Sequence, residues 1–357
     1  MKLLTSFCSI AFLCCAVLLF SSGCTSTTVI TSPFPGSSDG KYDSDLIGDD
    51  GSAILESASA SVRRVIVNAF YSTYVFSSTS SIKKGDLSTE NLSRLSIHTV
   101  VTSRSQAGSA VTLHSTRSGI VLLTCAHIVN FPDTVYSYFV GEDGKASPYI
   151  QSISIKTSQS NFVAGIPAND VVEVISVDAP NDLALIGTTY REYTAIPFPA
   201  FAYTFGDSRE LTMGTTVFAF GFPLSNKMVS RGIVSSTNID DKGNYHIDVV
   251  SNRGFSGGLV VAIRDGIPNI EMIGMITSIY AESYYILRPE EPKGDETLLS
   301  SEPYESKAYV DELRMIRYGI TKVISTKVIQ DYLLKNKEKL DRWGFNPETV
   351  VRGKKGN

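Results

Sequence analysis

The sequence has few cysteines, and their positions exclude an internal disulfide from the body of the chain. Four of the five, Cys8, Cys14, Cys15 and Cys24, lie within the first 24 residues, so Cys125 has no partner beyond them. Cys125 lies in an apolar run and is expected to be a small buried hydrophobe rather than a nucleophile. The 334 residues from Cys24 onward (357 − 23) suffice for a core without cross-links.

The chain also lacks a surplus of either charge. Its 36 acidic and 32 basic residues give a net charge of −4, and 43% of its residues are hydrophobic. This composition excludes a disordered chain, and the charge gives no support to a nucleic-acid partner, which usually binds a basic patch. The sequence has no HExxH motif, no paired cysteine spacing and no glycine-rich phosphate loop, so we expect no metal and no cofactor.

An apolar run long enough to cross a membrane is missing as well. Phe7 to Phe20 is apolar apart from Ser9, but it spans only 14 residues. A transmembrane helix takes about 20, which excludes a multi-span membrane protein. A run of this length, behind Lys2 and followed by small residues, is typical of an export signal.

The residues after this run, Ser22-Gly23-Cys24, resemble the lipobox of bacterial lipoproteins, although Ser21 stands where that family favours Leu. The resemblance implies that residues 1–23 are a signal peptide and that Cys24 carries the lipid. It also implies a place in the bacterial cell envelope, on the extracytoplasmic side of the outer or the cytoplasmic membrane. Simple secretion and a retained helical anchor are the alternatives.

Composition changes along the chain. Residues 24–60 are rich in Ser, Thr, Gly and Asp, which is typical of a flexible tether, with an ordered arm on the domain as the alternative. From Val62 onward, short runs of β-branched and aromatic residues are separated by Gly, Asn, Asp and Ser. Because the runs show no βαβ rhythm, they predict an all-β sandwich or barrel.

A single domain is predicted over residues 61–340, followed by a tail at 341–357. A helix is expected at about Thr326 to Leu340, because several apolar side chains fall near one face: Ile329, Tyr332, Leu333 and Leu340. Two segments resemble insertions, at about 131–170 and 279–312. The second holds nine acidic residues against three basic ones and is predicted to be a surface loop, with a role in partner binding as the alternative.

The stretch Asn252 to Gly258 has a composition suited to nucleophilic catalysis. A Ser hydroxyl is a weak nucleophile until a base takes its proton. Glycines beside Ser256 allow a tight turn in which the N–H groups of Gly254 and Ser256 can point at one spot. That spot can hold the oxyanion of an acyl-transfer intermediate. An ordinary glycine turn is the alternative.

Such a Ser needs a base to take its proton and an acid to orient that base. His127 ends an apolar run, which would position it rigidly, and imidazole is suited to the role by its pKa. Asp182 precedes the apolar residues 183–186, where a buried carboxylate needs a partner, with Asp178 as its rival and a cap or turn role as the alternative. The remaining histidines are expected to be structural or superficial: His98, His114 and His246.

Taken together, these stretches resemble the trypsin/chymotrypsin-like serine peptidases, and within them the bacterial HtrA-type branch. The chain order His, Asp, Ser is that of the chymotrypsin arrangement. Thr124-Cys125-Ala126-His127 is similar to the family's Thr-Ala-Ala-His, and Asp182-Leu183-Ala184-Leu185 to its Asp-Ile/Leu-Ala-Leu. Asp248 to Gly258 is similar to the HtrA nucleophile loop, and the likeness extends over roughly 95 to 335.

The resemblance implies an all-β fold, a chymotrypsin-like double antiparallel β-barrel with a C-terminal α-helix. It implies endopeptidase cleavage of a protein or peptide substrate through an acyl-enzyme. Ser256 would be the nucleophile, His127 the general base and Asp182 its orienting acid. The N–H groups of Gly254 and Ser256 would form the oxyanion hole. The alternatives are a catalytically silent, protease-like binding or assembly module, and an esterase; the oligomeric state is not predicted.

Departures from the family pattern carry their own expectations. Phe255 stands where trypsin-type zymogens carry Asp and HtrA proteins usually carry Asn, so activation by a new N-terminus is not expected. Val250, six residues before Ser256, would form the floor of the specificity pocket and predicts an uncharged, apolar P1 residue. Phe222 or Ile276 could also shape that pocket. Only 17 residues (341–357) follow the helix, so no PDZ domain is expected.

Overall fold

The computed structural model describes residues 40–43, 51–141, 145–167, 169–192, 196–289 and 308–351. Contacts divide the chain into Met1–Ser37 and Ser38–Asn357, and all described residues belong to the second unit. The predicted signal peptide and Cys24 lie outside the described residues. Within the described ranges, no helix has both the length and the apolar character needed to span a membrane.

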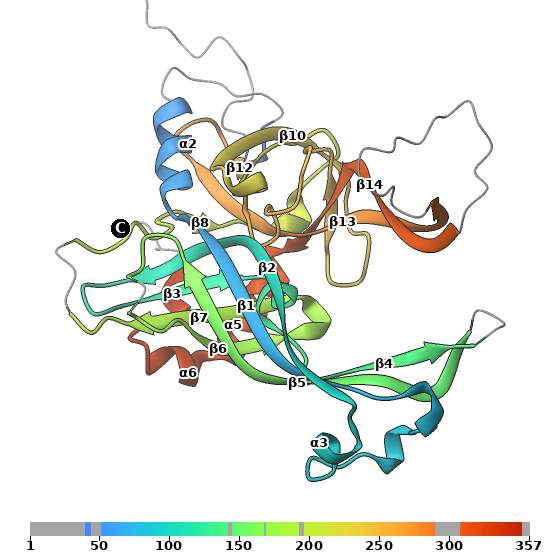
Figure 1. Ribbon diagram of the computed structural model, residues 1–357. Coiled ribbons are helices and arrows are strands. Elements are labelled where there is room, and N and C mark those ends of the chain that lie inside the picture. The colour runs from blue at the N-terminus through green and yellow to red at the C-terminus, as the bar shows by residue number, and fades with distance from the viewer. Residues whose placement is uncertain are drawn as a thin grey trace, which may run out of the picture. The chain divides into compact units, whose positions relative to one another are not determined.

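The first seven strands form one antiparallel sheet with the order β4-β5-β1-β2-β3-β7-β6 (Figure 1). Its central strands carry the apolar runs seen in the sequence, and every residue of β3 except the first is buried. The strands are β1 (Val62–Val75), β2 (His98–Ser115), β3 (Gly119–Thr124), β4 (Thr134–Val140), β5 (Ala146–Val163), β6 (Glu173–Asp178) and β7 (Leu183–Thr189).

The other seven strands form a second sheet with the order β12-β9-β10-β11-β14-β13-β8. An additional pairing of β12 with β13 closes this sheet into a barrel, and β8 adds to β13 as a parallel strand. The strands are β8 (Thr204–Phe205), β9 (Thr216–Gly221), β10 (Met228–Ser236), β11 (Tyr245–Ile247), β12 (Leu259–Ile263), β13 (Ile270–Pro289) and β14 (Ala308–Ser325).

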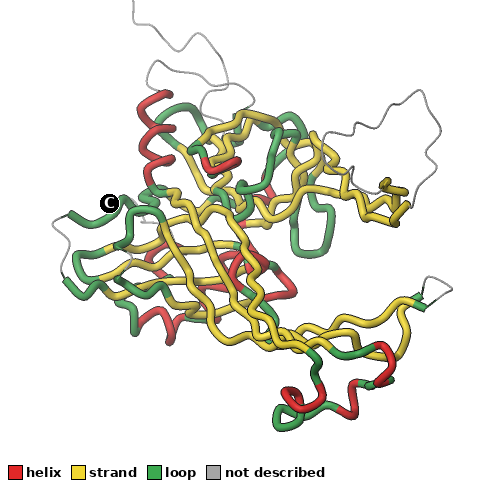
Figure 2. Tube along the Cα trace, in the orientation of Figure 1, coloured by secondary structure: helices red, strands yellow, loops and turns green. Residues whose placement is uncertain are grey.

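Helices are short and lie mostly at the ends of the described chain (Figure 2). The predicted C-terminal helix is present, and Ser325 caps it by accepting a hydrogen bond from the Val328 N–H. The structure divides the expected helix at Asn336, so that Leu340 lies on a second short helix, but all four residues expected on the inner face are buried: Ile329, Tyr332, Leu333 and Leu340. The helices are α2 (Gly51–Ala60), α3 (Leu92–Leu95), α4 (Ala126–Val129), α5 (Thr326–Lys335), α6 (Lys337–Asp341) and α7 (Glu348–Val351). The expected all-β fold of two barrel-like sheets with a C-terminal helix is confirmed.

Of the flexible tether expected over residues 24–60, residues 24–39 and 44–50 lie outside the described residues, and the described parts, 40–43 and 51–60, pack on the domain. Tyr42 is buried, its ring lies 4.1 Å from the guanidinium of Arg264, and its hydroxyl donates to Glu271 Oε2 at 2.8 Å. Residues 51–60 form α2, and Ala58 on this helix is fully buried. The described residues before β1 therefore form an ordered arm, because their apolar side chains find partners on the domain.

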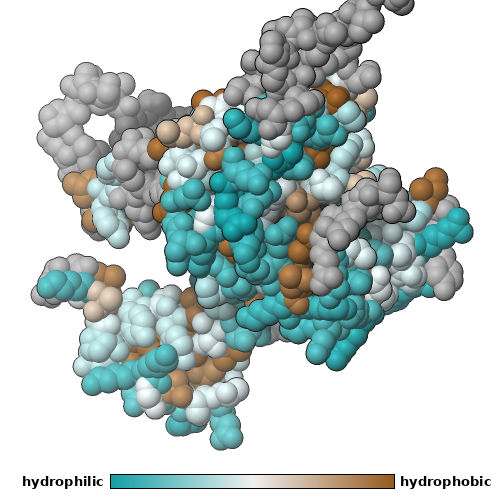
Figure 3. All heavy atoms as spheres, turned by 180° about the vertical axis from the view of Figure 1, so that it is seen from behind, coloured by the Kyte–Doolittle hydropathy of each residue, from teal (hydrophilic) through white to brown (hydrophobic). Residues whose placement is uncertain are grey.

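The two expected insertions also differ from the prediction. Most of 131–170 lies in β4 and β5, and β5 pairs with β1 inside the first sheet. Around the second segment, β13 and β14 pair out to Pro289 and Ala308, so its described residues form a hairpin rather than a loop. The hairpin exposes apolar side chains, among them Tyr285, Leu287 and Val310. Similar brown patches interrupt the mostly hydrophilic face in Figure 3.

Candidate active site

His127 and Asp182 meet because the ends of two neighbouring strands lie together. β3 ends at Thr124, and the single turn of α4 that follows carries His127. Asp182 lies directly before β7, the strand that pairs with β3. The Ala126 N–H donates to the Asp182 carbonyl at 3.1 Å, which joins the two strand ends. Asp182 has a left-handed backbone, φ +54°, a conformation that Asp tolerates better than most residues.

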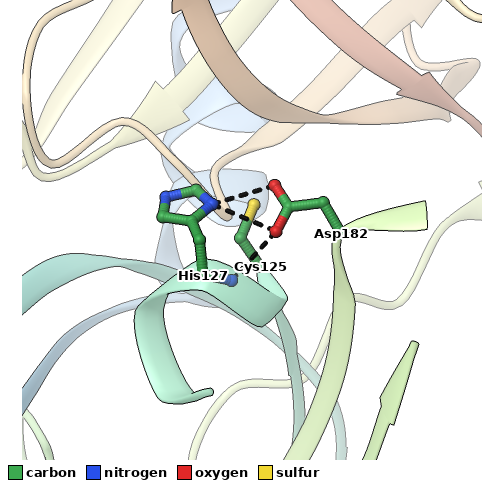
Figure 4. A group of neighbouring side chains, drawn as sticks. All are labelled: Cys125, His127 and Asp182. Atoms are coloured by element: carbon green, nitrogen blue, oxygen red, sulfur yellow. Dashed lines mark hydrogen bonds and ion pairs between the residues drawn. The ribbon is translucent and has the colours of Figure 1, made fainter. Parts of the chain in front are cut away.

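The side chains of this pair are directly hydrogen-bonded (Figure 4). His127 Nδ1 lies 2.9 Å from Asp182 Oδ2 and 3.1 Å from Oδ1, and the His127 backbone N–H donates to Oδ1 at 2.9 Å. A carboxylate can only accept, so Nδ1 carries the proton in this contact. In the neutral imidazole, Nε2 is then the free acceptor, which is the form that a general base requires.

A third group, Thr277 in β13, holds Asp182 from the second sheet. The Thr277 hydroxyl donates to Asp182 Oδ2, the oxygen that also faces the imidazole. Burial alone would raise the pKa of Asp182, but the hydrogen bonds from His127 and Thr277 and the charge of His127 outweigh it and lower the pKa. Asp182 is therefore held as a carboxylate that fixes the imidazole.

The loop that carries Ser256 is shaped by close backbone approaches. Gly254 has φ +104°, and a Cβ there would collide with the carbonyl oxygen of Phe222. Gly257 has φ +81°, and a Cβ there would collide with the carbonyl oxygen of Ser109. Only glycine satisfies both demands at either position. The glycines around Ser256 are thus required by the turn itself.

Ser109 of β2 joins the first sheet to this loop. Its hydroxyl donates to the Gly254 carbonyl at 2.7 Å and accepts from the Phe222 N–H at 2.9 Å. Its backbone N–H donates to the Ser256 carbonyl at 2.7 Å. Because Ser109 is fully buried, no water can replace these bonds. The conformation of the Ser256 loop therefore depends on a residue 145 positions away in the sequence.

Phe255 fills space beneath the same loop. Its side chain is 1% exposed and belongs to the core of the second sheet. It packs so closely on Gly221 that a Cβ at Gly221 would lie 2.7 Å from its ring. The unusual residue before Ser256 is therefore accommodated as an apolar anchor of the loop. On either side of it, the N–H groups of Gly254 and Ser256 have no acceptor among the described residues.

The side chains of Ser256 and His127 face one cavity of about 510 Å³, and Gly254 and Phe222 line it as well. Ser256 Oγ donates to the carbonyl of Thr277 at 3.0 Å rather than to His127. The structure thus brings the three predicted triad residues and the predicted oxyanion groups to one place. The hydrogen bond from the Ser256 hydroxyl to His127 Nε2 that a working triad needs is not formed in this arrangement.

Other candidates from the sequence lie elsewhere. Val250, the expected pocket floor, is 64% exposed and does not line the cavity, whereas a pocket floor would be covered by the chain. Asp178, the rival acid, accepts hydrogen bonds from Asn181 at its own turn. His114 stacks on Phe345 at 5.4 Å. None of the three other histidines lines the cavity: His98, His114 and His246.

Cys125 lies close to the pair, and a ligand atom from each of Cys125, His127 and Asp182 falls within 4.8 Å of the others. The donor set does not suit a metal ion. Zinc requires a thiolate, but burial, the first cause, and the Asp182 carboxylate raise the pKa of Cys125. The thiol donates to the Ile276 carbonyl at 3.3 Å, and Nδ1 is occupied by Asp182. The three groups are better explained as a hydrogen-bonded pair with a buried thiol behind it.

Two residues of the site were not singled out by the sequence. Thr277 and Ser109 are hydroxyl residues inside otherwise apolar strand runs, and both are buried. A hydroxyl in such a run needs a partner, which is a signal that sequence alone can offer. The sequence alone cannot identify the partner, because Asp182 and Gly254 come close to Thr277 and Ser109 only in the folded chain.

Comparison with known proteins gives a partial match. Residues 108–268, which include His127, Asp182 and Ser256, match a family model described as a trypsin-like peptidase domain. No curated protein matches the chain. Two similar solved structures are the HtrA-type protease AlgW with a tripeptide and an AlgW variant with a decapeptide, each at 18% identity and a TM-score of 0.40. The alignments cover 79% and 83% of this chain, and 62% and 68% of those chains.

Proposed function

We propose that the protein is a serine endopeptidase in which Ser256, His127 and Asp182 form the catalytic triad. The observation that carries the proposal is the hydrogen-bonded pair of His127 and Asp182 beside a cavity that Ser256 and Gly254 also line. The trypsin-like peptidase match over the same residues supports it. A partly buried carboxylate that orients an imidazole, a free Nε2 on that imidazole and a Ser in a glycine turn are the parts that acyl transfer needs.

The geometry suggests the order of events. Ser256 exchanges its hydrogen bond to Thr277 for one to His127 by rotation about χ1, a movement between staggered wells that takes picoseconds to nanoseconds in exposed side chains. Nε2 then takes the Oγ proton as Oγ attacks the peptide carbonyl carbon. The resulting oxyanion accepts from the N–H groups of Gly254 and Ser256. Asp182 stabilises the imidazolium that this step creates.

The second half of the reaction uses the same residues. His127 gives its proton to the leaving amine, the C–N bond breaks and an ester to Ser256 remains. A water molecule, deprotonated by His127, attacks this ester and releases the acid product. Each oxyanion donor is worth about 10²- to 10³-fold in rate, so the conformation of the Gly254 loop matters as much as the triad.

The N-terminal segment supports a second part of the proposal, which concerns location. We propose that Cys24 is lipidated and anchors the domain to a bacterial membrane on its extracytoplasmic side. Between Cys24 and Gly40, where the described residues begin, 16 residues can span at most about 55 Å. The anchored enzyme would therefore work close to the membrane. Partition into detergent of wild type, with loss for Cys24→Ser and no loss for Cys8→Ser, tests this part.

One observation favours a second candidate, a catalytically silent binding or assembly module of peptidase fold. Ser256 Oγ donates to the Thr277 carbonyl, and a site locked in this state would bind peptides without cleaving them. The two candidates differ in a measurable way, because only the peptidase forms an ester to Ser256.

The test is the value of kcat/KM on a library of internally quenched peptides. We expect cleavage by the wild type and a loss of at least about 10³-fold for Ser256→Ala and for His127→Ala. Ser93→Ala and His98→Ala remove the same groups from exposed positions that do not line the cavity, and they should cleave like the wild type. Cleavage that survives in Ser256→Ala would contradict the proposal.

A further inference from the structure

Two arginines from different parts of the fold line the cavity beside Ser256. Arg64 comes from β1 of the first sheet, and Arg253 comes from the loop that carries Gly254 and Ser256. Among the described residues, no acidic side chain lines the cavity, and His127 is the only other one there that can carry a charge. Every described residue that can carry a charge at this cavity, next to the proposed nucleophile, is therefore basic.

These two guanidinium groups have no partner among the residues that the structure describes. Other arginines do: Arg209 pairs with Asp207 at 2.6 Å, and Arg264 pairs with Glu210 at 2.7 Å. Arg64 is half-buried, and a partly desolvated cation gains most from a bound anion. The absence of an internal counter-charge leaves both groups available to a ligand.

A further basic residue lies close in the sequence to the segment that lines the cavity. Ser225 lines the cavity, and Lys227 follows two residues later, near Arg63 and Glu56. Burial, and then the charge of Arg63, lower the pKa of Lys227, whereas Glu56 raises it.

We propose that the enzyme selects substrates with an acidic side chain, Asp or Glu, beside the cleaved bond, bound in this cavity by Arg64 and Arg253. The inference rests on the proposed function and deepens it by naming a substrate class. It concerns a different place from the pocket expected at Val250, because Val250 does not line this cavity. Guanidinium groups suit the task because they offer two parallel N–H donors to a carboxylate.

The size of the effect is limited by solvent. Arg253 is exposed and its charge is screened, while Arg64 lies deeper. We expect the wild type to prefer Glu over Gln at the responsive position by roughly tenfold in kcat/KM. Gln has nearly the shape of Glu, so the ratio reports charge rather than fit. The Glu/Gln ratio of kcat/KM should fall as salt is raised from 0.05 to 0.5 M, because the Debye length shortens and the arginine charges are screened.

The experiment compares matched Glu and Gln peptides, with the pair placed in turn at each position around the bond that the library identifies. Arg64→Gln and Arg253→Gln should each reduce the Glu/Gln ratio by about threefold, and the double variant should bring it near one. Arg117→Gln removes the same charge from an exposed turn that does not line the cavity, and it should keep the wild-type ratio. The ratio is informative even if a variant changes the overall rate.

Binding of the same peptides to Ser256→Ala separates this inference from the proposed function. Tighter binding of the Glu peptide, lost in the Arg64→Gln/Arg253→Gln background, supports the acidic preference whether or not the wild type cleaves. Equal binding and equal cleavage of Glu and Gln peptides at every position would overturn the preference and leave the peptidase intact. Absence of cleavage alone would count against the proposed function only.

Discussion

Ser109→Ala should weaken both the fold and the catalytic loop. The Ser109 hydroxyl donates to the Gly254 carbonyl at 2.7 Å and accepts from the Phe222 N–H at 2.9 Å, in a place with no exposed surface. Alanine has almost the same shape but leaves one acceptor and one donor without a partner. An orphaned buried group costs about 1–3 kcal/mol, and somewhat less for the Phe222 N–H, which is only partly buried, so the loss of stability should be about 2–5 kcal/mol.

The second consequence concerns rate. The Gly254 carbonyl belongs to the peptide unit between the two N–H groups of the proposed oxyanion hole, and Ser109 holds that unit in place. If it turns, one donor is lost, and kcat should fall by about 10²-fold or more. The stability loss is smaller than the 5–15 kcal/mol that holds a typical domain together, so the variant should still fold for the assay.

Thr112→Val is the matched control. Thr112 lies three residues further along β2 and is also fully buried, but its hydroxyl has no hydrogen-bond partner among the described residues. Its replacement should therefore be neutral or stabilising. Urea unfolding followed by circular dichroism gives the free energy of unfolding of each variant. The melting temperature of Ser109→Ala should fall by about 4–10 °C. Equal stability and equal activity of the two variants would refute the reasoning.

Three further outcomes follow from the site. Gly254→Ala should abolish activity, because its Cβ meets a carbonyl oxygen, whereas Gly214→Ala, also at positive φ but in open space, should cost only about 1–2 kcal/mol of stability. Thr277→Val should move acid unfolding to higher pH. Because the folded pKa of Asp182 is lowered, its ionised carboxylate stabilises the fold above about pH 3.9, and this stabilisation is lost as pH falls through the folded pKa. The variant removes one hydrogen bond to the carboxylate and so raises the folded pKa. Thr277→Ser should restore the wild-type midpoint. Cys125 should resist iodoacetamide in the native protein and react in urea, because burial raises its pKa, as peptide mass mapping would show.

The parts of the site that could be predicted share a local signal. Ser256 is surrounded by glycines whose positive φ angles the turn demands, and His127 and Asp182 each adjoin an apolar strand. The seven-strand sheets and the C-terminal helix follow from runs of β-branched residues and from one amphipathic stretch. Such features depend on near neighbours in the sequence, where pattern carries information.

The features in which the structure differs from the sequence-based prediction depend on contacts between residues far apart in the chain. Polar composition favoured a tether, yet Tyr42 packs on Arg264, more than 200 residues away. Acidic composition favoured a loop over 279–312, yet the described residues at both ends of this segment pair as β13 and β14, because backbone hydrogen bonds do not depend on side-chain charge. Residues 290–307, with six of the nine acidic residues, lie outside the described part of the chain. The role of Ser109 and the gathering of Arg64 with Arg253 likewise arise only when the two sheets meet.

Covalent labelling of the full chain with an alkyl fluorophosphonate probe tests the central claim most directly, because such a probe reacts readily with a Ser whose proton a neighbouring base removes. We expect one added phosphonyl group per molecule, with loss of fluoride from the probe, mapped to Ser256 by peptide mass spectrometry, and no labelling of Ser256→Ala or His127→Ala. A folded wild-type protein that remains unlabelled under conditions that label a known serine peptidase, or that is labelled elsewhere, would contradict it.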